Sequence, residues 1–107
     1  MGDAKLQRIL DALRVEISHA LGDQLDSVIL FGSQARAEAH EGSDIDVLVV
    51  VRGDFDCGDM IRRTSAGVAA LSLEHDVVIS RTFVSRDEFE NSRTPFLLNV
   101  HREGVPV

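Results

Sequence analysis

The sequence of 107 residues contains one cysteine, two prolines, no tryptophan and no tyrosine. Because Cys57 is the only cysteine, no disulfide can form within the chain, and we expect a reducing, cytoplasmic location. The longest apolar run, Val47–Val51, is far shorter than the roughly 20 residues that span a bilayer. We therefore expect neither a membrane segment nor a signal peptide.

Basic residues are also scarce, since 11 Lys and Arg stand against 18 Asp and Glu, which gives a net charge of −7. Binding to DNA or RNA depends on Lys and Arg at phosphates, so no direct nucleic acid binding is expected. The acids instead form solvated surface, bind cations or match a basic partner. Hydrophobic residues make up 44% and charged residues 27%, which is ordinary for one globular domain spanning residues 1–107.

The hydrophobic spacing predicts helices that alternate with strands. Helices are expected over residues 4–21, 32–38, 60–71 and 94–103, with another helical start at the capping box of residues 85–88. Strands are expected over residues 27–31, 44–51 and 75–80. The strand 44–51 has apolar residues on both faces, which predicts a central strand covered on both sides. We expect an α/β (α+β) fold with a small mixed sheet of about three strands flanked by helices.

Gly32 and Ser33 directly follow the first predicted strand and open the short predicted helix. A helix start offers free backbone N–H groups and the positive end of the helix dipole, where a phosphate binds well. The alternative is a plain turn with Ser33 as a helix cap. The sequence has no Gly-x-x-x-x-Gly-Lys-Ser/Thr motif, which excludes a P-loop NTPase.

Asp44 and Asp46 begin the second predicted strand, and their carboxylates should point to one face, about 7 Å apart along the strand. The same face continues with Leu48 and Val50, so it should be a core face. Two acids aimed at a core repel each other and need a pairing partner or a metal. The alternative is that Asp44 lies in solvent and only Asp46 is partly buried.

Asp76 on the third predicted strand is the candidate for a third carboxylate. Three carboxylates from neighbouring strands can hold two Mg²⁺ ions about 4 Å apart. If the register differs by two residues, Glu74 takes this place instead. Asp76 could also be an acid at the strand end that faces solvent.

The spacing Gly32-Ser33, ten residues, then Asp44-x-Asp46 resembles the signature of the DNA polymerase β-like nucleotidyltransferase superfamily. Residues 32–49, the Asp76 segment and the tail 95–104 are similar to its minimal nucleotidyltransferase (MNT) branch, so nearly the whole chain is covered. Two features depart from the pattern. Ala37 stands where such proteins often have glycine, and the chain carries no appended domain for binding an acceptor.

The resemblance implies a polymerase β palm-like nucleotidyltransferase fold and a role for each motif residue. Asp44 and Asp46 would bind both Mg²⁺ ions, and Asp76 would bind the ion that activates the acceptor hydroxyl. Gly32 and Ser33 would hold the β- and γ-phosphates of an NTP. Arg36 would neutralise charge on the triphosphate, although it could also be a solvent-exposed arginine. The metal ions would then stabilise the charge that develops as pyrophosphate leaves.

The resemblance also implies a metal-dependent enzyme that moves a nucleoside monophosphate, AMP from ATP, to an acceptor hydroxyl. MNT proteins commonly act as the antitoxin of a HEPN toxin, so the expected acceptor is a tyrosine of such a partner protein. One alternative is an antitoxin that acts by binding alone, with weak or no catalysis. Another is an enzyme that modifies a small molecule such as an aminoglycoside. Both a homo-oligomer and a hetero-oligomer stay open.

Overall fold

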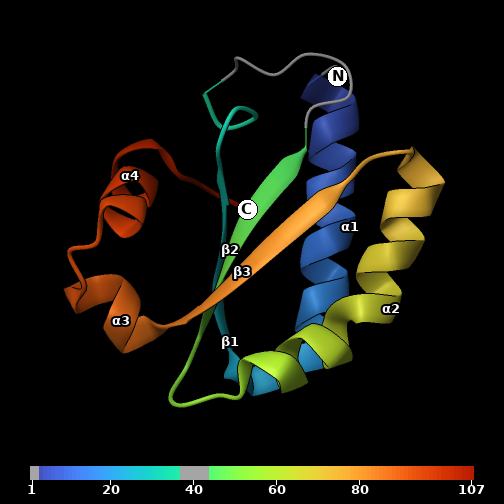
Figure 1. Cartoon of the computed structure of the whole chain (residues 1–107). Helices are drawn as coiled ribbons and strands as arrows, with labels where there is room; N and C mark the ends of the chain where they lie inside the picture. Colours follow the sequence, from blue (N-terminus) through green and yellow to red (C-terminus); the bar gives the residue numbers. More distant parts are fainter. Residues whose placement is uncertain (1–2, 37–43) are drawn as a thin grey trace.

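The computed structural model describes residues 3–36 and 44–107, and its elements form three layers with a sheet in the middle (Figure 1). In chain order the elements are α1 (Asp3–Leu21), a 3₁₀ turn η1 (Gly22–Gln24), β1 (Leu25–Phe31), β2 (Ile45–Val51), α2 (Cys57–His75), β3 (Ile79–Ser85), α3 (Arg86–Asn91), α4 (Pro95–Glu103) and β4 (Val105–Pro106). Within the described ranges, no helix is long and apolar enough to cross a membrane.

The sheet is mixed, with the strand order β3-β2-β1-β4. β1 runs antiparallel to both β2 and β4, whereas β2 and β3 run parallel. The mixed sheet confirms the predicted fold class, and its fourth strand is the difference. β4 has only two residues, one of them Pro106, so it carries no alternating pattern that a sequence could reveal.

β2 is a central strand whose two faces pack against different helices, as its sequence predicts. Ile45 and Val47 belong to the larger core cluster, which includes residues of α1 and α2. Leu48 and Val50 belong to a smaller cluster with Val84 of β3 and two residues of α4. Figure 1 shows the result, with α1 and α2 on one side of the sheet and α3 and α4 on the other.

The third strand begins later than its prediction of residues 75–80, because α2 continues to His75. Asp76 ends the helix in the left-handed conformation, with φ 52° and ψ 52°, and its backbone N–H donates to the Ser72 carbonyl. The placement of Asp76 on a strand was therefore wrong. The sequence misled because the valines after Asp76 have strong strand propensity, although they only link α2 to β3.

The short helix predicted over residues 32–38 is a turn in its described part, residues 33–36. Ala37 and Glu38 lie outside the described residues. The predicted cap at Ser85 is confirmed, since its hydroxyl accepts a hydrogen bond of 3.1 Å from the Glu88 N–H. The final helix is confirmed as well, with Pro95 in its first turn and Gly104 at its C-terminal cap.

Candidate active site

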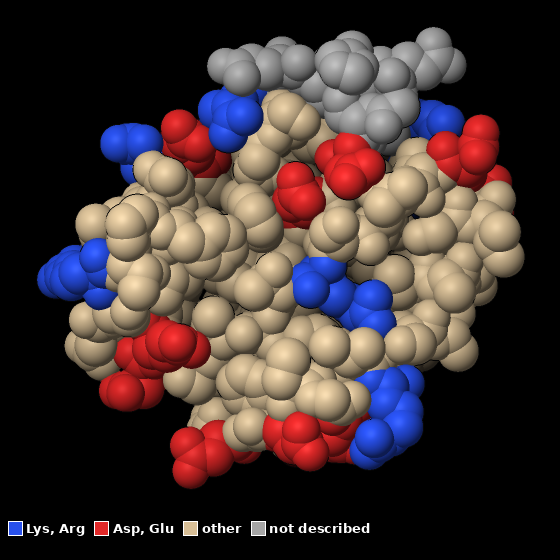
Figure 2. Space-filling view, viewed as in Figure 1, with Lys and Arg blue, Asp and Glu red and all other residues tan. Residues whose placement is uncertain are grey.

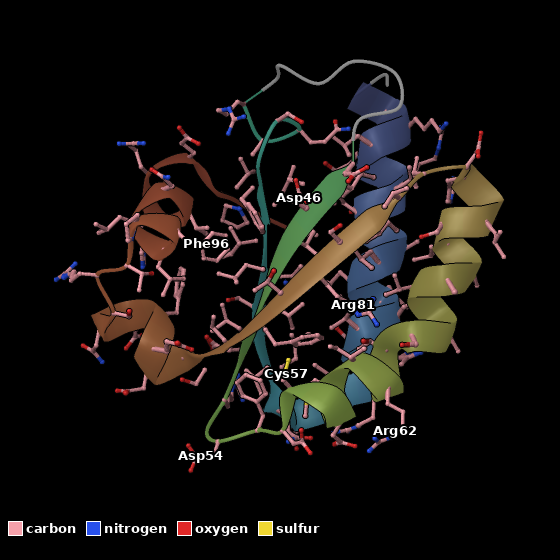
Figure 3. All side chains as sticks on the ribbon, viewed as in Figure 1. Asp46, Asp54, Cys57, Arg62, Arg81 and Phe96 are labelled. Carbon is pink, nitrogen blue, oxygen red and sulfur yellow. The ribbon has the colours of Figure 1, made fainter. Side chains whose placement is uncertain are left out.

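Asp46 is the second residue of β2, and the sheet places it between two neighbours. It pairs with Phe31 of β1 on one side and with Ser80 of β3 on the other. Because side chains alternate along a strand, its carboxylate shares the face of Leu48, which packs toward α4. Asp46 is half-buried and lies at the upper end of β2 in Figure 3.

Gly32 presses its backbone directly against the Asp46 carboxylate. A Cβ added at this glycine would lie 2.6 Å from Oδ2 of Asp46, so the carboxylate would have to move to make room for it. Gly32 also has a φ of +77°, in the left-handed region that favours glycine. The turn after β1 thus approaches the carboxylate as only glycine allows.

Asp44 comes immediately before β2 and is exposed. The next residue, Ile45, is held in the sheet by its N–H, which donates a hydrogen bond of 2.9 Å to the Val78 carbonyl. Burial and the nearby charge of Asp44 both raise the pKa of Asp46 above its ordinary value. This arrangement matches the alternative in which only Asp46 is partly buried. Figure 2 shows acidic side chains at this end of the molecule. A cation at the pair would relieve the repulsion that raises this pKa.

The turn that follows β1 carries the other predicted residues. Ser33 is half-buried within it, and the Arg36 N–H donates to the Gly32 carbonyl at 3.2 Å. The Arg36 guanidinium forms an ion pair of 3.2 Å with Glu103 at the end of α4. Sequence reasoning did not single out Glu103, because nothing local connects it to a turn 67 residues earlier.

Asp76 does not form one metal-binding group with Asp44 and Asp46. It is exposed at the end of α2, and Glu74, the alternative third ligand, is exposed on the same helix. Among residues 3–36 and 44–107, no group of three or more His, Cys, Asp or Glu side chains is placed to hold one metal ion together. In this structure the acidic site consists of Asp44 and Asp46.

Ser80 occupies the position on β3 that the sequence reasoning gave to Asp76. It pairs with Asp46 across the parallel strands and is exposed on the same face. Arg81 fixes this register, because its guanidinium donates to Thr64 Oγ1 at 2.8 Å and to the Ile61 carbonyl of α2 at 3.0 Å. The sequence indicates this register only through the alternation after Val78, in which Ile79 and Phe83 face the core and Arg81 lies between them on the same face.

A pocket of about 240 Å³ lies between α1, the turn and the C-terminal residues, with Leu10, Leu30 and Val107 among its lining. Leu30 belongs to the larger core cluster, so this pocket opens on the face of the sheet away from Asp46. It is therefore separate from the acidic site.

Comparison with known proteins identifies the fold and the family. Residues 11–94 match the family model of the nucleotidyltransferase domain. The Methanocaldococcus jannaschii protein MJ0141, named as a candidate protein adenylyltransferase, is 33% identical over 99 residues, which cover 92% of this chain and 95% of the relative. A solved structure described as a candidate minimal nucleotidyltransferase is 26% identical with a TM-score of 0.58, and the match covers 95% of each chain.

A third match concerns the fold alone, because its sequence identity is only 20%. It is a chain of the complex between the tri-AMPylated Shewanella oneidensis HEPN toxin and its MNT antitoxin, with a TM-score of 0.54. That match covers 99% of the present chain and 71% of the other. The mixed sheet and the turn at Gly32 are consistent with the family match over residues 11–94. This chain belongs to the nucleotidyltransferase family, and a minimal nucleotidyltransferase is among its structural relatives.

Proposed function

We propose that this chain transfers AMP from ATP to a hydroxyl group of a partner protein. The observation that carries the proposal is the half-buried Asp46 carboxylate, held against Gly32 where the turn after β1 begins. That contact brings a predicted phosphate-binding backbone and a cation-binding acid to one point. The name of the MJ0141 relative supports protein adenylylation, and the AMPylated toxin of the Shewanella oneidensis complex supports a protein acceptor.

The two acids fit a divalent metal such as Mg²⁺. Carboxylate oxygens are the ligands that Mg²⁺ prefers, and it completes its coordination with water and substrate phosphates. Asp44 and Asp46 would hold the ion, and their charges explain why a cation is favourable there. When bound, the metal supplies Lewis-acid stabilisation of charge on the phosphates. The proposed site comprises these two acids, and we assign Asp76 and Glu74 to the end of α2.

The remaining site residues would bind and orient the triphosphate. The backbone of Gly32 and the hydroxyl of Ser33 would contact the β- and γ-phosphates, and Arg36 would offset their charge. In the reaction, the acceptor oxygen forms a bond to the α-phosphorus while the bond from that phosphorus to the bridging oxygen breaks. Pyrophosphate leaves, and the hydroxyl proton passes to solvent.

A second candidate function is an antitoxin that blocks its HEPN-type toxin by contact alone. The observation in its favour is that the described residues bring two, not three, carboxylates together. Both functions require a partner protein, and the acidic net charge of −7 suits a partner with a basic surface.

The test is to incubate the chain with ATP, Mg²⁺ and a HEPN-type candidate partner protein, sought first in the adjacent reading frame, and to record the intact mass of that partner. We expect a mass gain of one or more AMP units on the partner. Asp44→Asn and Asp46→Asn should each abolish the gain, because each removes a charged ligand. Asp54→Asn is the matched control, since Asp54 is exposed in the loop at the opposite end of β2 (Figure 3).

Two outcomes would decide between the functions. If the partner gains no mass but forms a stable complex that loses its toxicity, the binding antitoxin is correct. If the partner gains mass and Asp46→Asn still transfers AMP while remaining folded, the site assignment is wrong.

A further inference from the structure

Phe96 is an aromatic side chain left open to solvent next to the proposed site. It lies in the first turn of α4 and is 40% exposed, whereas α4 buries Leu97 and Val100. Its ring meets the ring of Phe31 edge-on, with centroids 5.2 Å apart and an interplanar angle of 82°. Because Phe96 keeps 40% of its surface exposed beside this contact, part of its ring is accessible to another flat group.

Phe31 connects this ring to the acids. It pairs directly with Asp46 across β1 and β2, and such partners have Cβ atoms about 5 Å apart on one face of the sheet. Phe31 also precedes Gly32, the first residue of the turn. The aromatic pair therefore borders both the carboxylate and the proposed phosphate site, and Figure 3 shows Phe96 between α4 and the sheet.

The other side of Asp46 has a different chemistry. Ser80 and Thr82 of β3 are exposed there on the same face, and both side chains are small and hydroxylated. Around Asp46, the surface toward β1 and α4 is aromatic, and the surface toward β3 is polar. Of these two surfaces, only the aromatic one offers a large flat area for stacking a base.

We propose that Phe96, supported by Phe31, is the stacking platform for the nucleobase of the bound NTP, and that it favours purines. The proposal rests on the proposed function, because it takes the triphosphate to lie at the turn of Gly32 and Ser33. Stacking on an aromatic ring accepts every base and increases with the size of the base, so ATP and GTP should bind better than CTP and UTP. The acceptor hydroxyl then approaches over Ser80 and Thr82.

The absence of tryptophan gives a direct test. Phe96→Trp introduces the single tryptophan of the chain, which reports on whatever stacks against it. With Mg²⁺ present, ATP should quench its fluorescence, and inorganic tripolyphosphate should not, because it has no base. Leu98→Trp is the control, since Leu98 lies two residues away on α4 and is 45% exposed.

Affinity measurements complete the test. Calorimetric titration of Phe96→Ala should show about 5- to 150-fold weaker ATP binding, the range expected for loss of one stacked base, with unchanged tripolyphosphate binding. Leu98→Ala should bind both ligands like the wild type. Phe31→Ala is less informative, because Phe31 packs against the smaller core cluster and its loss would also disturb that packing.

The results separate this inference from the proposed function. If the wild type binds ATP and Phe96→Ala binds it equally well, the platform is wrong and the proposed function stands. Equal affinity for purine and pyrimidine nucleotides would also overturn the platform. If the folded wild type binds neither ATP nor tripolyphosphate, both proposals fail.

Discussion

Two features of the structure favour glycine at position 32. Its φ is positive, and its backbone lies close to the Asp46 carboxylate. Gly32→Ala should therefore strain the backbone and also push the Asp46 carboxylate away from its position. We expect a loss of stability of about 1–2 kcal/mol from the left-handed conformation and at least a tenfold loss of AMP transfer. Urea unfolding and the mass assay measure the two effects.

Gly53→Ala is the control for this substitution, because its φ of +71° is similar and an added Cβ would meet nothing within 4 Å. It should lose comparable stability and keep its transfer activity and Mg²⁺ affinity. Equal activity losses in the two variants would show that backbone strain alone, and not displacement of Asp46, explains the effect.

Asp46 itself should lower the stability of the metal-free fold. Burial, and then the charge of Asp44, raise its pKa above the ordinary 3.8, so the folded chain holds this proton more tightly than the unfolded chain. The associated stability is complete below 3.8 and is lost as the pH rises through the raised pKa. At pH 7 in EDTA, Asp46→Asn should therefore be more stable, by at most about 1 kcal/mol because solvent screens a half-exposed carboxylate.

The pH dependence tests this assignment. The advantage of Asp46→Asn should shrink as the pH falls toward 3.8, where the wild type also becomes neutral at this position. Mg²⁺ should raise the melting temperature of the wild type and have little effect on the variant, because a ligand that binds the native state stabilises it. A variant that is less stable than the wild type at pH 7 in EDTA would mean that the carboxylate is a structural group.

At the scale of elements, the register of β3 decides which side chain stands beside Asp46. Since Ser80 holds that position, Ser80→Asp should place a third carboxylate next to Asp44 and Asp46 and raise Mg²⁺ or Mn²⁺ affinity severalfold. Asp76→Asn should leave the metal affinity unchanged, because Asp76 lies at the end of α2. Titration with Mn²⁺ measures both. A marked loss of affinity in Asp76→Asn would contradict the described position.

The outline of the fold could be predicted from the sequence where a segment has a clear period and ends in a capping residue. β2 shows this, since both faces are apolar and Arg52 and Gly53 end the run, and so does the helix that begins at Pro95. β3 could not be predicted correctly because Ser80, Arg81 and Thr82 interrupt its apolar residues. Arg81 belongs on this strand only through its hydrogen bonds to α2, which no local pattern encodes.

The same reasoning applies to the candidate site. The pair Asp44 and Asp46 and the glycine turn follow from a short motif, and the structure brings Gly32 and Asp46 into contact. Phe31, Ser80 and Glu103 border the site only through strand pairing and an ion pair between distant segments. Which residues border the site depends on the register of the strand pairs, because a shift of one strand by a few residues brings a different residue next to Asp46.

At the scale of the whole molecule, the hydrophobic clusters on the two faces of the sheet differ in size. Among residues 3–36 and 44–107, the cluster under α1 and α2 contains 17 buried residues, and the cluster under α4 contains five. Local opening requires less free energy where fewer apolar contacts are broken. Amides of α4 should therefore exchange with solvent at least about tenfold faster than those of α1, as measured by native-state hydrogen exchange.

Nucleotide binding should reduce the difference in amide exchange rate between α4 and α1. ATP with Mg²⁺ should slow exchange in α4, which carries Phe96 and Glu103, and leave α1 nearly unaffected. Tripolyphosphate should protect α4 less, because it lacks the base. Protection confined to α1 would place the ligand on the other side of the sheet.

Cys57 lies exposed at the start of α2, and Figure 3 shows it at the end of the molecule opposite Asp46. Since the sequence has no other thiol and no indole, one maleimide dye attaches at a single known point without any prior substitution. Together with a tryptophan at position 96, the dye forms a donor–acceptor pair that spans the sheet. A single substitution, Phe96→Trp, thus turns the chain into a spectroscopic ruler, on which the proposed binding of nucleotide and of a partner can be timed in one stopped-flow trace.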